Sequence, residues 1–79
     1  MDSWPDGPRF VVRENTGYPI YEENRQGAVE RTEIMVLDRA YCHNVVWTNW
    51  NNPLVATLPL HKQRSHAHLV ADHMERHND

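Results

Sequence analysis

The chain has 79 residues, of which 8 are Lys or Arg and 11 are Asp or Glu, giving a formal charge of −3 at pH 7. A chain this short buries only about 60% of its unfolded surface, which leaves room for one thin core and excludes a second domain. Hydrophobic residues make up 39% of it, too many for a fully disordered chain. The acidic balance argues against nucleic-acid binding, which requires a basic face.

The single cysteine, Cys42, has no second thiol in the chain to pair with, whereas small secreted scaffolds usually carry several. We therefore expect the protein to work in a reducing cytoplasm. The first five residues lack the pattern of a signal peptide, and no apolar run approaches the roughly 18 residues of a membrane span. No membrane association is expected.

Residues 1–8 predict an irregular N-terminal arm, because two prolines and a glycine oppose regular pairing, and residues 9–79 predict a single small domain. The β-prone runs 10–13 and 18–21 flank Gly17, which predicts a short hairpin with its turn at 15–17. Pro19 has no N–H to donate, so the second run belongs on the edge of a sheet. A further turn is expected at 24–27.

The stretch 34–48 supports two interpretations. Ile34, Leu37, Tyr41 and Val45 have helical spacing, but the many β-branched and aromatic residues favour strands. We predict strands at about 30–38 and 44–50, joined by a loop that contains residues 40–43, and the choice between strand and helix stays open.

Residues 60–77 predict a C-terminal helix, because Pro59 suits a first helical turn and nothing after it breaks the helix. At 100° per residue, one stripe of this helix is apolar and is expected to face the core. The predicted fold is α+β: a small antiparallel sheet of three or four strands with one C-terminal helix packed on it. The stripe comprises Leu60, Ala67, Val70, Ala71 and Met74.

Residues 41–60 contain no Asp, Glu, Lys or Arg. A buried strand with its following loop would explain this, but so would a binding surface, because aromatic side chains among neutral polar groups make good contact residues. Tyr41, Trp47 and Trp50 are the candidate partner-binding residues, with Trp4 of the arm as a further anchor.

Five of the six histidines lie in residues 61–77, and His66, His73 and His77 project from neighbouring positions on one helix face. His73 and His77 have the i, i+4 spacing that lets two imidazoles reach one ion. With Cys42 and His43 they suggest an alternative function as a small zinc-stabilised protein, whereas the solvated-face interpretation requires no cofactor.

No enzymatic activity is predicted. Cys42 and His43 are adjacent, so on a strand they would point to opposite faces, and no Ser-His-Asp order, glycine-rich phosphate loop or carboxylate pair is present. A chain of this size also builds a water-excluding pocket with difficulty.

The segment 36–47, with the pattern Asp38-Arg39-x-x-Cys42-His43-x-Val45-Val46, resembles small uncharacterised proteins of actinobacteriophages. The resemblance implies a phage-encoded accessory protein in the cytoplasm of a bacterial host. We therefore expect a non-enzymatic module that binds a host or viral protein. Self-association into a homo-oligomer is compatible with the thin core and with open sheet edges.

A third interpretation follows from layout alone. A sheet backed by one helix is similar to plant-type DNA-binding domains that insert a sheet into the major groove. Phosphate contacts dominate such binding, and the net negative charge opposes it. The sheet would present Arg9, Arg13, Arg31 and Arg39 among many acids.

Overall fold

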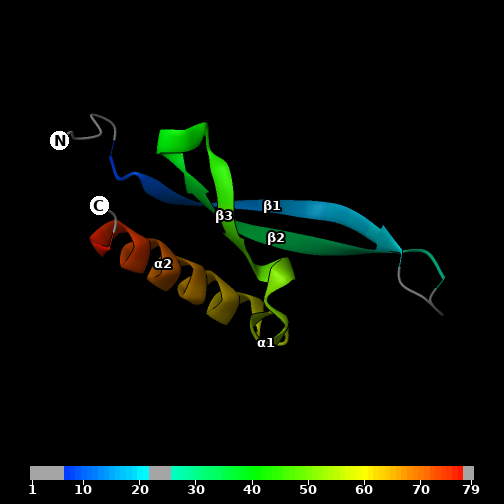
Figure 1. The fold of residues 1–79 in the computed structure, drawn as a ribbon. Helices are drawn as coiled ribbons and strands as arrows, with labels where there is room; N and C mark the ends of the chain where they lie inside the picture. Colours follow the sequence, from blue (N-terminus) through cyan, green and yellow to red (C-terminus); the bar gives the residue numbers. More distant parts are fainter. Residues whose placement is uncertain (1–6, 22–25, 78–79) are drawn as a thin grey trace.

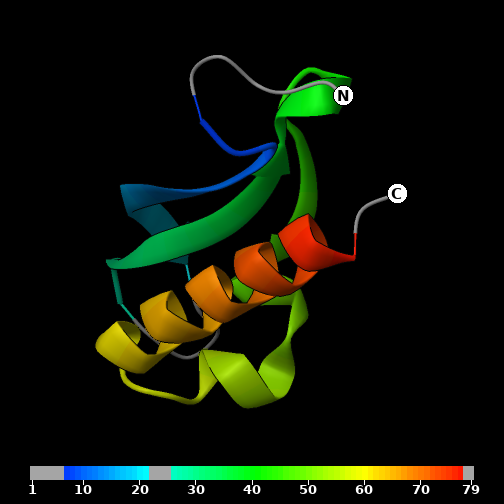
Figure 2. The same cartoon turned by 90° about the vertical axis from the view of Figure 1, so that its left-hand side faces the viewer.

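The protein was analysed as a computed structural model that describes residues 7–21 and 26–77. Strands β1 (Phe10–Tyr21), β2 (Ala28–Asp38) and β3 (Asn44–Thr48) form an antiparallel sheet in the order β1-β2-β3. Helix α2 (Leu60–Arg76, 17 residues) crosses one face of this sheet (Figures 1 and 2). The predicted α+β fold is confirmed, with three strands and one C-terminal helix.

The predicted short hairpin at 10–21 is wrong, because β1 runs through it without turning back. Thr16 pairs with Thr32 and Tyr18 pairs with Arg31, so Gly17 is an extra residue in the strand, a β-bulge. Its φ of +91° suits both a bulge and a tight turn, and the local sequence does not distinguish them. β1 instead pairs with β2 along its length, from Phe10 opposite Asp38 to Tyr21 opposite Ala28, and residues 24 and 25 of the predicted turn at 24–27 lie outside the described residues.

The region 34–48 consists of strands, as the β-branched residues favoured. Between β2 and β3 lies a 3-10 turn, η1 (Arg39–Tyr41), which the carboxylate of Asp38 caps by accepting a hydrogen bond from the N–H of Ala40 at 2.9 Å. Cys42 and His43 follow with φ of 56° and 58°, the left-handed region that reverses the chain. β3 then contains its own bulge at Val46, because Val36 and Leu37 pair with Trp47 and Val45.

Two short elements that the sequence analysis did not predict join β3 to the helix. They are the 3-10 turn η2 (Asn49–Asn51) and the helix α1 (Pro53–Ala56). Pro53 is at the first helical position, where its missing N–H costs nothing. The predicted strand 44–50 therefore ends two residues early.

The core lies between α2 and the sheet. Ile34 and Val36 of β2 are fully buried against Ala67 and Ala71 of α2, whose small side chains let the helix approach closely. Leu60 was predicted to face this core but is exposed, and Gln63 of the same helix is buried instead. The partly buried side chains around the core are Phe10, Val12, Val46, Trp47, Val70 and Met74.

The paired strands β1 and β2 are longer than the helix that covers them, and the end of the pair at Tyr21 and Ala28 projects beyond the body of the molecule (Figure 1). The radius of gyration is 14.6 Å, whereas a compact chain of this length has about 11.6 Å. The residues of β1 and β2 that form the core with α2 or pack against it all lie at the other end of the strand pair, and they include Phe10, Val12, Ile34 and Val36.

Candidate functional site

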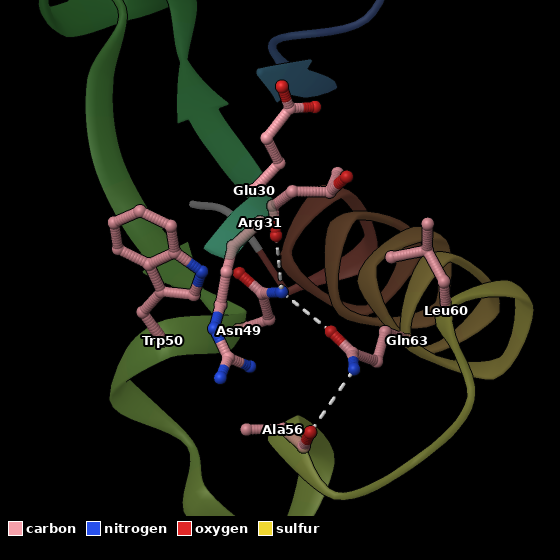
Figure 3. Close-up of a pocket in the computed structure, with 8 residues that line it drawn as sticks. Glu30, Arg31, Asn49, Trp50, Ala56, Leu60 and Gln63 are labelled. Carbon is pink, nitrogen blue, oxygen red and sulfur yellow. Dashed lines mark hydrogen bonds between the residues drawn. The ribbon is translucent and has the colours of Figure 1, made fainter. Parts of the chain in front are cut away.

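A cleft of about 280 Å³ opens where β2, η2, α1 and the start of α2 meet (Figure 3). Half of its eight lining residues come from the uncharged segment 41–60, and the other half from β2 and from Gln63 of α2. Of the aromatic residues that the sequence predicted as partner-binding, Trp50 lines this cleft. The lining residues are Glu30, Arg31, Thr32, Asn49, Trp50, Ala56, Leu60 and Gln63.

The cleft has a floor of two buried amides, with Asn49 at its centre and only 2% exposed. Its Nδ2 donates to the carbonyl of Thr32 at 3.2 Å and to Oε1 of Gln63 at 2.6 Å. Its Oδ1 accepts from the backbone N–H of Ile34 at 3.0 Å. One side chain therefore fixes the position of β2 relative to η2 and α2.

Gln63 continues this network into the segment that leads to the helix. Its Nε2 donates to the carbonyls of Leu58 at 2.8 Å and Ala56 at 3.3 Å, while its Oε1 accepts from Asn49. All the hydrogen-bonding groups of both amides are thereby engaged within the protein. Buried amides satisfied in this way hold the geometry of the loop and have no free group to offer a ligand.

Four large apolar side chains around this floor are exposed, and we call them together the apolar corner: Trp50, Leu54, Leu58 and Leu60. All four side chains are at least 38% exposed, and Leu54 is 85% exposed. They come from η2, α1, the connection after it and the first residue of α2, which succeed one another at one end of the molecule. Exposed apolar residues grouped in this way mark interaction sites more often than scattered ones.

Glu30 and Arg31 of β2 provide the charge at the cleft. Figure 3 shows Arg31 next to the indole of Trp50, with Glu30 above it. Since the pair is neutral overall and segment 41–60 carries no charge, the cleft is electrically neutral at pH 7. Its net charge therefore favours neither anions nor cations.

Trp47 lies at a second hollow, of about 310 Å³, along β3. Its ring is half-buried and packs against the imidazole of His66, with 5.7 Å between the ring centroids. Trp47 therefore contributes to the packing of α2 on the sheet as well as to a surface. The hollow is lined by Val45, Val46, Trp47, Thr48, Asn51 and Asn52.

Tyr41 is exposed on η1, in the turn between β2 and β3, and contacts a different set of residues. The guanidinium of Arg9 lies 5.3 Å from the centre of its ring and binds the carboxylate of Asp38 through two hydrogen bonds of 2.8 and 2.9 Å. These bonds lower the pKa of Asp38. The predicted aromatic set is thus divided among separate contacts, and Trp4 lies outside the described residues.

The structure does not bring the predicted zinc ligands together as one set. Within residues 7–21 and 26–77, no three His, Cys, Asp or Glu side chains are placed to hold an ion. Cys42 and His43 are exposed in the turn before β3, and His66 packs against Trp47. His73 and His77 alone of the predicted ligands contact each other, with 4.3 Å between their ring centroids.

Sequence analysis missed the two buried amides and two of the leucines of the apolar corner. Gln63 was recognisable in principle, because it stands four residues before Ala67 and eight before Ala71, on the core-facing stripe. A polar residue at such a position implies a buried hydrogen-bonding partner. Nothing in the sequence identified Asn49 as that partner among four neighbouring asparagines.

Comparisons with protein-family models, with curated proteins and with solved structures found no match of any kind. In the described part of the chain, no helix has the length and apolarity needed to cross a membrane. The function must therefore be inferred from the residues of the site.

Proposed function

We propose that this protein is a non-enzymatic binding module that attaches to another protein through the apolar corner. The observation that carries the proposal is the exposure of four large apolar side chains at one end of the molecule, next to a neutral cleft. Leu54 exposes 85% of its surface and contributes little to the core. Burying such side chains against a partner contributes about 25 cal/mol per Å² of apolar area.

A macromolecular partner suits this site better than a reaction does. Catalysis requires polar or titratable groups that are free to act on a substrate, and the polar atoms in the floor of the cleft are engaged with one another. The residues of the apolar corner come from several successive elements, which favours an extended contact. Trp50 is the natural anchor, since tryptophan dominates the energetics of many protein interfaces.

The partner's chemistry follows from the surface. It should present apolar side chains to the corner and neutral or paired groups to Glu30 and Arg31 at the cleft. The resemblance of segment 36–47 to small phage proteins supports a host or viral protein as this partner. The exposed thiol of Cys42 is compatible with a reducing cytoplasm, where we place the interaction.

Site-specific photo-crosslinking in host cells tests the proposal. A photoreactive amino acid is placed at position 54 and, as the matched control, at position 69, since Leu69 is 65% exposed on α2 away from the corner. We expect one discrete crosslinked protein from position 54 and none from position 69. A second substitution, Trp50→Ala, should abolish the crosslink at position 54 while the circular dichroism spectrum is retained.

The proposal fails if positions 54 and 69 give the same crosslinking pattern. It also fails if the product from position 54 is unchanged by Trp50→Ala. If Trp50→Ala instead unfolds the domain, Leu58→Ser replaces it, because Leu58 is exposed and the hydrogen bonds it makes to Val55 and Gln63 use only its backbone N–H and carbonyl.

A further inference from the structure

The last turn of α2 carries two histidines that the apolar corner does not use. His73 and His77 are both exposed, and their ring centroids lie 4.3 Å apart with 36° between the ring planes. His77 is the C-cap of the helix, and its backbone N–H donates to the carbonyl of His73 at 3.1 Å. The backbone bond and the ring contact thus join the same two residues.

This arrangement has a defined chemistry. Two imidazoles four residues apart on a helix face can reach one metal ion together. Imidazole nitrogen binds Zn²⁺ at about 2.0–2.1 Å and also suits Cu²⁺ and Ni²⁺, whereas Mg²⁺ and Ca²⁺ prefer oxygen ligands. We propose that His73 and His77 form a two-imidazole chelate for a divalent transition-metal ion, with water completing its coordination.

The helical turn spanned by the proposed chelate also holds the start of β1. Glu75 lies between the two histidines in the sequence, and its carboxylate accepts hydrogen bonds from the backbone N–H of Phe10 at 3.0 Å and of Arg9 at 3.4 Å. An ion bound by both imidazoles restrains the turn that carries Glu75. Metal binding therefore stabilises the contact between the C-terminal end of α2 and the first residues of β1.

The site differs from a structural zinc centre in two respects. It has two protein ligands instead of four, and it lies on the surface, so the fold forms without the ion and the ion strengthens one contact. It is also independent of the apolar corner, which lies at the other end of α2. Failure of one proposal therefore leaves the other unaffected.

Isothermal titration of the tag-free chain with CuCl₂, ZnCl₂ and MgCl₂ at pH 7.5 tests the chelate. We expect one ion per chain, tighter binding of Cu²⁺ than of Zn²⁺, and no binding of Mg²⁺. Either His73→Asn or His77→Asn should weaken Cu²⁺ binding by about tenfold or more, because each removes the intramolecular second ligand. His61→Asn is the matched control, since position 65 holds Ser, and should leave the affinity unchanged.

Amide hydrogen exchange by NMR tests the coupling to β1 in the same samples. Exchange of the Phe10 N–H should slow when Zn²⁺ is added to the unmodified chain and should not respond in His77→Asn. The site is overturned if His73→Asn and His77→Asn bind Cu²⁺ no more weakly than His61→Asn does. The coupling is overturned if Zn²⁺ binds but Phe10 exchange does not change.

Discussion

The two ends of the helix-covered body are held by different chemistry. Under the apolar corner, the neutral side chains of Asn49 and Gln63 join β2, η2 and α2 in a nearly water-free setting, with exposures of only 2% and 8%. At the opposite end, where β1 begins, charged groups make the connections, from Arg9 to Asp38 and from Glu75 to backbone amides. Hydrogen bonds between neutral groups thus hold the end under the apolar corner, and hydrogen bonds of charged side chains hold the end where β1 begins.

The two kinds of contact contribute unequally to the free energy of unfolding. Breaking a buried hydrogen bond leaves partners that have no access to water, at about 1–3 kcal/mol for each unsatisfied group. Breaking an exposed ion pair lets both groups return to water, and such pairs typically contribute about 0–1 kcal/mol. The proposed binding surface therefore lies over the end of the molecule where losing a polar contact lowers the free energy of unfolding the most.

The largest effect is expected from Asn49→Leu. The substitution keeps the approximate size of the side chain but leaves the N–H of Ile34, the carbonyl of Thr32 and Oε1 of Gln63 without their partner. We expect the free energy of unfolding to fall by about 3 kcal/mol or more, measured by urea denaturation. Because the domain is small, the variant could also lose its cooperative unfolding transition altogether, which would agree with the same prediction.

The matched control for this change is Asn51→Leu, because Asn51 is exposed in the same short turn. It should alter the free energy of unfolding by less than about 0.5 kcal/mol. If Asn49→Leu lowers the free energy of unfolding no more than the control does, the amide network does not hold the end under the apolar corner, and the proposed difference between the two ends is wrong.

A smaller effect is expected at the charged end from Asp38→Asn. Asp38 is buried, receives two hydrogen bonds from Arg9 and caps η1 through the N–H of Ala40. Asparagine keeps one acceptor oxygen, so we expect a loss of about 1–2 kcal/mol in urea denaturation at pH 6.5. Asp72→Asn, on the exposed side of α2, is the control and should be nearly neutral.

Part of this fold could be predicted from the sequence alone. The sheet and the helix were predictable because β-branched residues are concentrated at 34–36 and 45–48 and because nothing interrupts the helical segment that follows Pro59. The long hairpin was not, since Gly17 with a positive φ fits a turn and a bulge equally well, and only pairing with a distant strand decides between them. The preferences of neighbouring residues for strand or turn do not show which distant residues a strand will pair with.

The candidate site was predictable only in part. An uncharged aromatic segment pointed to residues 41–60, and Trp50 does line the cleft. However, the aromatic residues diverge, because the turn at Cys42 and His43 carries Tyr41 towards Arg9, while the bulge at Val46 turns Trp47 towards α2. Both features depend on backbone conformations that residue type alone does not fix.

In acid, the free energies of unfolding of the unmodified protein and of Asp38→Asn should become more alike. Hydrogen bonds from Arg9 lower the pKa of Asp38 in the folded state, so the carboxylate stabilises the fold fully above its unfolded pKa of about 3.9. That stabilisation is lost as the pH falls through the lowered folded pKa. Urea denaturation at pH 6.5 and again below pH 3 should show the gap between the two proteins narrowing, and a gap that widens in acid contradicts the assignment.

The smallest effect is expected from Glu14→Gln, which tests the most exposed ion pair. Glu14 of β1 binds Arg64 of α2 through both carboxylate oxygens, and these bonds lower its pKa, but the two side chains remain 29% and 42% exposed. Water and salt screen such a pair, so the substitution should cost only about 0.2–1 kcal/mol at low salt and close to nothing in 1 M NaCl. Asp38→Asn provides the contrast, because its buried pair is screened less and its cost should persist at high salt. If salt removes both costs equally, burial does not distinguish the two ion pairs.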